Sequence, residues 1–188
     1  MTALPLLEQC APAIAPVTMA AVVQQESGGN PLALHDNTAG RSYRPGSVAA
    51  AARVARELIA QGHSVDIGLA QINSRNLPGL GLSVDRVLDP CRNLQAAQSV
   101  LLDGWARSGT LAGALSAYNT GRITSTQGAK YGAGVYAQAG VVVSGIPGGR
   151  MARWALAGAA LPPVRPLVSW TPQASPLKPG AGDLRPRW

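Results

Sequence analysis

Glu26 is the residue whose setting in the sequence best suits acid–base chemistry. The chain has three glutamates, of which Glu57 stands close to arginines on a predicted helix and Glu8 has no distinctive neighbours. Glu26 follows Met19 by seven residues and Val22 by four, a spacing that aligns side chains along one face of a helix. The carboxyl group is therefore expected in line with an apolar stripe, although the same pattern also fits a boundary glutamate that points to solvent.

The position of Glu26 near the end of its predicted helix favours a neutral carboxyl group. Gly28 and Gly29 follow within three residues and are typical of a helix end. The helix dipole disfavours a negative charge in the last turn, and burial disfavours it further, so both raise the pKa of Glu26. A carboxyl group that stays protonated near neutral pH can act as a general acid toward a glycosidic oxygen.

A mainly α domain over residues 1–140 is expected to position this acid. Ser47, Asn93 and Thr110 each precede an apolar helical pattern and are expected to cap a helix. The predicted helices are Leu4–Cys10, Thr18–Ser27, Val48–Gln61, one that starts at Asn93 and ends before Gly109, one that follows Thr110, and Ala129–Ala139. The segments 28–46, 62–92 and 119–128 are rich in Gly, Asn and Pro and are expected to be loops. No alternating strand pattern is strong enough to build a sheet, but a short β-ribbon fits around 64–73.

Three short segments resemble signature motifs of the lytic transglycosylases, which are peptidoglycan-cleaving enzymes of the lysozyme-like type. Residues 25–31 read QESGGNP, residues 66–73 read DIGLAQIN, and residues 117–121 read AYNTG. Residues 89–94, DPCRNL, are further similar to a stretch of the small transglycosylases associated with type IV secretion. The resemblance covers residues 4–140. Ala70 departs from the methionine that is common in the second motif, and this change removes no catalytic group.

The resemblance implies cleavage of the bond between N-acetylmuramic acid and N-acetylglucosamine in peptidoglycan glycan strands. Glu26 would protonate the bridging oxygen and then accept the proton of the muramoyl 6-hydroxyl, which closes a 1,6-anhydro ring without consuming water. The acetamido group of the substrate stabilises the oxocarbenium-like state, so no second carboxylate and no cofactor are required. The residues expected to bind substrate are Ser27, Tyr43, Gln71, Asn73, Tyr118 and Asn119.

Several of these side chains also have a structural interpretation. Gln71 and Asn73 could satisfy loop backbone groups, and Ser27 could cap the end of its helix. Tyr118 lies on an apolar stripe and could belong to the core. Tyr43 lies in a polar loop, where a tyrosine can stack on a sugar ring or simply face solvent.

A hydrolytic lysozyme with the same fold and the same acid is the nearest alternative enzyme. True lysozymes often use a second carboxylate, and Asp36 and Asp66 are the candidates that could position a water molecule. The family resemblance favours a structural, hydrogen-bonding role for Asp66. The products separate the two reactions, since water leaves a reducing end and the sugar's own hydroxyl leaves an anhydro end.

Cys10 and Cys91 are the two cysteines of the chain, and they form no CxxC pair. From their spacing they could be free thiols or a disulfide that closes a loop of roughly 80 residues and stabilises the fold by about 4 kcal/mol. The resemblance implies the disulfide, because the cysteine of the family's DPCxNL stretch pairs with one near the N-terminus. A disulfide indicates an oxidising compartment such as the periplasm, although residues 1–7 do not resemble a signal peptide. His35 and His63 show no zinc-like spacing with the cysteines, so no metal site is expected.

Residues 141–188 are expected to form a basic, extended, Pro-rich tail. This segment has six Lys or Arg against one Asp, whereas residues 1–140 have ten basic against eight acidic residues. It also holds eight of the fifteen prolines and the tryptophans Trp154, Trp170 and Trp188. Such a tail could dock to components of a type IV secretion apparatus or fold back on the domain. A wall-binding or assembly module is therefore a rival to the enzyme.

Nucleic-acid and membrane-spanning functions are not expected. The Lys and Arg residues are scattered, and neither zinc-finger spacing nor a base-stacking motif is present. No apolar run reaches the length of about 18 residues that suggests a transmembrane helix.

Overall fold

Helix α2, Pro16–Ser27, carries Glu26 in its last turn in the computed structural model, which describes residues 3–140. Pro16 suits the first turn because the N–H group that proline lacks would have no partner there. Gly28 ends the helix with a φ of 64°, in the left-handed region that favours glycine. Met19 and Val22 are fully buried, so the predicted apolar stripe is confirmed, and the helix starts two residues earlier than predicted.

Three further helices accompany α2 in one half of the molecule, and a fourth contacts both halves. They are α1 (Ala3–Cys10), α6 (Pro90–Ser108), α7 (Leu111–Thr120) and α8 (Thr126–Gln138). Thr110 caps α7 as predicted, since its hydroxyl accepts a hydrogen bond from the Gly113 N–H at 3.0 Å. Ser125 caps α8 in the same way through the Gly128 N–H, so α8 begins three residues before the predicted start.

The predicted cap at Asn93 is wrong. Asp89 caps α6 instead, because its carboxylate accepts a hydrogen bond from the Arg92 N–H at 2.9 Å and Pro90 follows in the first turn. Asn93 lies inside the helix with only 1% of its surface exposed. Its side chain does not cap the helix and instead bonds to the loop that follows Ile67.

A small antiparallel sheet, which the sequence did not predict, forms the other half. Its strands are β1 (Leu34–Asp36), β2 (Arg41–Tyr43), β3 (Val65–Ile67) and β4 (Ile72–Asn73), in the order β2-β1-β3-β4. The pair β3–β4 confirms the ribbon predicted around 64–73, whereas β1 and β2 replace part of the loop predicted over 28–46. Strands of two or three residues are too short to show an alternating pattern, because their pairing depends on tertiary contacts.

Short helices also replace part of the loop predicted over 62–92. These are the 3₁₀-helix η1 (Ser74–Asn76), α4 (Leu77–Leu80) and α5 (Val84–Val87). The longer α3 (Val48–Ala60) begins as predicted at Ser47, whose hydroxyl accepts from the Ala50 N–H. Its buried alanines, Ala51, Ala52 and Ala55, allow the helix to pack closely beside the sheet.

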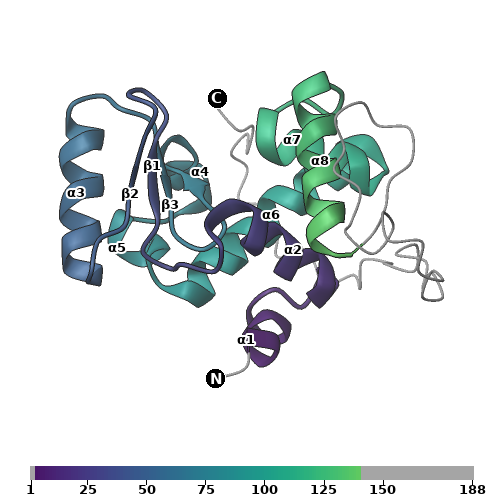
Figure 1. Cartoon of the computed structure of the whole chain (residues 1–188), viewed down its shortest axis with the longest axis horizontal. Helices are drawn as coiled ribbons and strands as arrows, with labels where there is room; N and C mark the ends of the chain where they lie inside the picture. The colour runs from purple at the N-terminus through teal and green to yellow at the C-terminus, as the bar shows by residue number, and fades with distance from the viewer. Residues whose placement is uncertain (1–2, 141–188) are drawn as a thin grey trace, which may run out of the picture.

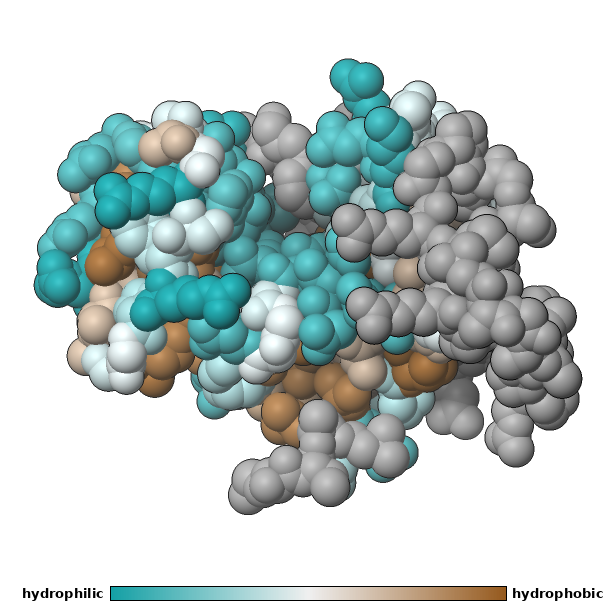
Figure 2. Space-filling view, viewed as in Figure 1, coloured by the Kyte–Doolittle hydropathy of each residue, from teal (hydrophilic) through white to brown (hydrophobic). Residues whose placement is uncertain are grey.

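The two halves lie side by side (Figure 1). The sheet, α3, α4 and α5 occupy one side of the view, α2, α7 and α8 occupy the other, and α6 runs between them. Hydrophilic residues fill the middle of this face where the halves meet (Figure 2). The mainly α, lysozyme-like fold is thus confirmed, with a small sheet in place of a single ribbon. Among the helices of residues 3–140, none is both long and apolar enough to cross a bilayer.

A disulfide between Cys10 and Cys91 joins the end of α1 to the first turn of α6. The Cα atoms of the two residues are 5.1 Å apart. This pairing is the one that the family resemblance implied. The tail predicted for residues 141–188, with Trp154, Trp170 and Trp188, lies outside the described residues.

Candidate active site

Glu26 is half-buried at the edge of an open cavity. Loss of solvent around the carboxyl group is the main reason that its pKa rises from 4.5 to about 7. A hydrogen bond from Tyr131 lowers the pKa in part, and the negative charge of Asp66 raises it. The direction agrees with the sequence prediction, so a large fraction of Glu26 is protonated near neutral pH.

Two stacked tyrosines lie in this region, and one of them bonds to Glu26. Tyr131 of α8 donates a hydrogen bond to Oε1 of Glu26 at 2.5 Å. The ring of Tyr118, from α7, lies nearly parallel to that of Tyr131, with 6.3 Å between the ring centroids. The Tyr118 hydroxyl donates to the Ala70 carbonyl at 2.6 Å. Burial raises the pKa of both phenols well above the usual range, so both remain neutral donors.

The cavity beside Glu26 has a volume of about 380 Å³ and is lined by residues of both halves. Polar side chains dominate the lining, as a carbohydrate site with many hydroxyl and amide groups requires. The lining residues are Glu26, Asn37, Thr38, Ser64, Asp66, Gln71, Asn73, Arg75, Tyr118, Asn119 and Gln127. Four of the six predicted substrate-binding residues, Gln71, Asn73, Tyr118 and Asn119, therefore lie together with the predicted acid.

Asn93 fixes the loop that follows β3. Its amide nitrogen donates to the carbonyl groups of Ile67 and Val87 at 2.8 and 2.9 Å, and its amide oxygen accepts from the Ala70 N–H at 2.8 Å. Gly68 lies against this amide with a φ of 82°, and a Cβ at this position would collide with the Asn93 side chain. The buried amide of Asn93 thus fixes both ends of the segment from Ile67 to Ala70 by hydrogen bonds.

Gln71 combines a structural bond with a place on the cavity wall. Its amide nitrogen donates to the carbonyl groups of Gly68 and Ala33 at 2.8 and 3.1 Å. Its φ of 49° is the only positive value at a non-glycine residue in the described part of the chain. Such a backbone conformation is costly and is tolerated where the surroundings impose it, which is common at functional sites.

Amide groups occupy both oxygens of the second carboxylate in the cavity, Asp66. Oδ1 accepts from Asn73 at 2.6 Å, and Oδ2 accepts from Asn37 at 2.8 Å. Burial raises the pKa of Asp66, although these two bonds lower it in part. Asn73, only 2% exposed, also donates to Ser64 and accepts from the Arg75 N–H. This geometry gives Asn73 and Asp66 structural roles, and substrate contact by Asn73 stays a prediction.

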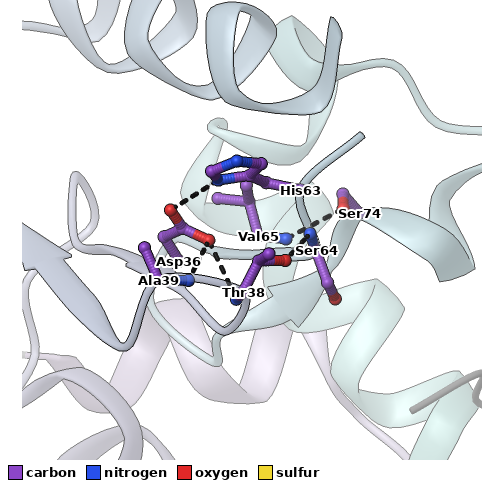
Figure 3. A network of polar contacts seen from close by, with 7 residues as sticks. All are labelled: Asp36, Thr38, Ala39, His63, Ser64, Val65 and Ser74. Carbon is purple, nitrogen blue, oxygen red and sulfur yellow. Dashed lines mark hydrogen bonds and ion pairs between the residues drawn. The ribbon is translucent and has the colours of Figure 1, made fainter. Parts of the chain in front are cut away.

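Asp36, the other candidate carboxylate, points toward His63 (Figure 3). The distance from its Oδ2 to Nδ1 of His63 is 2.7 Å, and its Oδ1 accepts from the N–H groups of Thr38 and Ala39. Burial alone raises the pKa of Asp36, but these hydrogen bonds outweigh it, and the net pKa lies below the usual value. Asp36 does not line the cavity. It ties the β1–β2 turn to the segment that leads into β3.

Two predicted substrate-binding residues lie away from the cavity lining. Ser27 donates to the Leu69 carbonyl at 2.7 Å and accepts from the Gly29 N–H, so it joins the end of α2 to the loop of Gln71. Tyr43 lies in β2, with the guanidinium group of Arg41 over its ring at 5.0 Å. Their contact with substrate stays a prediction. Among residues 3–140, no three His, Cys, Asp or Glu side chains are grouped so that they could hold a metal ion.

Comparison with known proteins gives the family. Residues 5–135 match the family described as "Transglycosylase SLT domain". The chain belongs to this family. It is 44% identical over 123 residues to protein virB1 of Agrobacterium fabrum, a match that covers 62% of this chain and 50% of that protein. It is 39% identical over 143 residues to the type IV secretion system protein virB1 of Brucella abortus, covering 71% of this chain and 60% of that protein.

The chain thus spans about half of the length of the curated relatives it matches. No solved structure matches it significantly. The family match nevertheless covers every residue of the cavity, from Glu26 to Gln127. The resemblance to lytic transglycosylases of type IV secretion that the motifs indicated is therefore confirmed at the level of the family and its named relatives.

Sequence reasoning missed Tyr131, which bonds to Glu26, and five residues that line the cavity of this SLT domain: Asn37, Thr38, Ser64, Arg75 and Gln127. A signal for Tyr131 was present, because Gly128, Tyr131, Gly132 and Val135 follow the same i, i+3, i+4, i+7 rule that singled out Glu26. Gln127 and Arg75 are exposed and belong to no apolar stripe. Only the tertiary structure brings them beside the acid.

Proposed function

We propose that this SLT domain is a lytic transglycosylase that cleaves peptidoglycan glycan strands between N-acetylmuramic acid and N-acetylglucosamine. The supporting observation is a single available acid in a polar cavity, Glu26, with a pKa of about 7. The one other carboxylate on the described cavity wall is Asp66, whose two oxygens are engaged by amide groups. A reaction that needs one proton-carrying group and no nucleophilic carboxylate fits this arrangement.

The proposed reaction returns the proton to the enzyme. Glu26 donates its proton to the bridging oxygen as the bond from C1 of the muramoyl sugar to that oxygen breaks. The 6-hydroxyl oxygen of the same sugar then bonds to C1, and its proton passes to Glu26, which is restored. Tyr131 donates to Oε1, so the proton resides on Oε2, which accepts no hydrogen bond from the described residues. Tyr131 is a positioning residue in this scheme.

Hydrolysis by the same acid is the second candidate, because Asp66 lines the same cavity. A carboxylate there could hold a water molecule in addition to its two amide donors. The two reactions use the same fold and the same proton donor, and they differ only in which oxygen attacks C1.

We further propose in which compartment, and with which apparatus, the protein acts. Relatives that share 39–44% identity with the chain are named virB1, and several are named type IV secretion system proteins. The disulfide between Cys10 and Cys91 suits an oxidising compartment. We propose that the protein acts in the periplasm, where it opens the wall locally for a type IV secretion apparatus, and that residues 141–188 contact components of this apparatus.

Analysis of digestion products tests the reaction. Wild type, Glu26→Gln and Glu57→Gln proteins are incubated with purified peptidoglycan, and the soluble products are measured by mass spectrometry. Glu57 is the matched control because it is an exposed glutamate that pairs with Arg53 on the surface of α3. We expect 1,6-anhydromuramoyl products from wild type and Glu57→Gln only. Products with reducing ends would establish hydrolysis instead, and equal activity of Glu26→Gln would exclude Glu26 as the acid.

A further inference from the structure

Arg75 is the basic residue on the described wall of the cavity beside Glu26. It is exposed, and within the described residues no carboxylate oxygen lies within 4.0 Å of its guanidinium group. The described arginines that form ion pairs, Arg53, Arg56 and Arg107, belong to α3 and α6. A free guanidinium group therefore faces the space in which the glycan strand is proposed to bind.

The backbone of Arg75 is anchored although its side chain is exposed. The Arg75 N–H donates to Oδ1 of the buried Asn73 at 3.0 Å. The hydroxyl of Ser74 accepts from the Val65 N–H at 3.1 Å, which ties η1 to β3. Leu77 follows as a buried residue. The fold thus fixes the backbone of Arg75 beside the cavity and leaves its guanidinium group exposed, as a residue that recognises a ligand requires.

Neither of the other charged groups on the described cavity wall forms an ion pair with Arg75. Glu26 is largely neutral at a pH below 7 because of its raised pKa. Asp66 directs both oxygens to the amide groups of Asn37 and Asn73 rather than to Arg75. Arg75 is thus available to an anionic group of a ligand, and its planar guanidinium group suits a carboxylate.

We infer that Arg75 is a specificity-determining residue that binds a carboxylate carried on the 3-O-lactyl substituent of a muramoyl sugar. This inference rests on the proposed function. The lactyl group ends in its own carboxylate where the stem peptide has been removed, and it leads to the carboxylates of the peptide where the peptide is present. N-acetylglucosamine has no such substituent. Arg75 therefore distinguishes the two alternating sugars and sets which of them lies next to Glu26.

Binding measurements test this role without turnover. Glu26→Gln serves as the parent protein, and Arg75→Gln or Arg86→Gln is added to it. Arg86 is the matched control because it is an exposed arginine that does not line this cavity. Dissociation constants are measured by titration calorimetry below pH 7 for three probes. These are peptide-free glycan strands, peptide-bearing strands, and a neutral oligomer of N-acetylglucosamine of equal length.

We expect Arg75→Gln to weaken binding of at least one carboxylate-bearing probe by about fivefold to tenfold. It should leave the neutral oligomer unchanged and reduce the dependence of binding on salt. The probe that responds identifies the source of the carboxylate, since only peptide-free strands carry the lactyl carboxylate. Arg86→Gln should resemble the parent with all three probes.

Two results would overturn the inference. In one, Arg75→Gln binds all three probes like the parent; in the other, it loses affinity equally for the neutral oligomer, as a merely structural residue would. Either outcome leaves the proposed function intact if the parent binds glycan strands. Failure of the parent to bind any glycan would instead count against the proposed function.

Discussion

The carboxyl group of Glu26 links catalysis to stability. Its pKa is 4.5 in an unfolded chain and about 7 in the folded protein, so the folded state binds the proton more tightly. The contribution of Glu26 to the free energy of unfolding is therefore most favourable below pH 4.5 and falls as the pH rises toward 7. The shift corresponds to a loss of about 3 kcal/mol once Glu26 is fully charged.

Glu26→Gln should remove this dependence. We expect the variant to gain stability relative to wild type as the pH rises, with a difference that grows from 4.5 to 7 and then levels off. Urea unfolding of both proteins at one pH below this window and one above it measures the difference. A constant difference across the window would show that the folded protein does not raise the pKa of Glu26.

Tyr131 is the second residue with a testable electrostatic effect. Its hydrogen bond to Oε1 lowers the pKa of Glu26, so Tyr131→Phe should raise that pKa above its present value of about 7. The proton donor must be protonated, hence the fall of activity at high pH should move to higher pH in the variant. The maximal rate should drop by about tenfold because the acid loses a fixed orientation.

A pH–rate profile of Tyr131→Phe measures both effects. Tyr136→Phe is the control, because Tyr136 is a half-buried tyrosine on the same helix that does not line the active-site cavity. A profile that keeps its shape and loses only amplitude would argue that Tyr131 contributes packing and not a bond to Glu26.

At the scale of elements, the close approach of α7 and α8 places Tyr118 and Tyr131 side by side. Gly128 permits this approach, since a Cβ there would overlap the side chain and the Cα of Ser116. Gly128→Ala should therefore force the helices apart and destabilise the fold by about 2 kcal/mol, as overpacking of a tight contact does. The same displacement should reduce activity, because Tyr131 would move away from Glu26.

Gly134→Ala provides the comparison on the same helix. The atoms nearest to a Cβ at this position belong to the end of the flexible Gln25 side chain, at 3.0 Å. Alanine should be neutral or stabilise the helix by up to about 1 kcal/mol. Thermal unfolding of the two variants measures the contrast. If both glycines tolerate alanine equally, the α7–α8 contact is not the constraint proposed here.

At the scale of the whole molecule, the disulfide between Cys10 and Cys91 closes a long covalent loop, with a sequence separation of 81. It fastens α1 to the start of α6, the helix that runs between the two halves. The double replacement Cys10→Ser and Cys91→Ser should lower the free energy of unfolding by about 4 kcal/mol through the greater entropy of the unfolded chain.

Activity should survive this replacement at temperatures where the protein stays folded. Neither cysteine lines the cavity beside Glu26, and Glu26 accepts a side-chain hydrogen bond from Tyr131 of α8. Denaturant unfolding with and without a reducing agent gives the stability difference, and a peptidoglycan assay on the folded variant gives the activity. A loss of activity without a loss of stability would reveal a role for the bridge in the site itself.

The sequence by itself determined the features that depend on near neighbours along the chain. The apolar stripe of α2, the glycine that ends it, and the caps Ser47 and Thr110 follow from local spacing and hydrogen bonding, so the longer helices and the place of Glu26 in the last turn of α2 could be predicted. The motif resemblance added the pairing of Cys10 with Cys91, which spacing alone left open.

The tertiary structure decided what depends on contacts between distant segments. Strands β1 and β2 have three residues each. They pair with each other, and β1 also pairs with the distant β3, which no local sequence pattern predicts. Asn93 had the residue type of a cap, yet burial against the loop after β3 gave its amide a different set of partners. Tyr131 reaches Glu26 across 105 positions of sequence, because two helices pack closely enough to bring them together. The raised pKa of Glu26 and the position of Arg75 on the cavity wall also depend on the folded chain. Desolvation of Glu26 and the proximity of Arg75 arise only when distant segments come together.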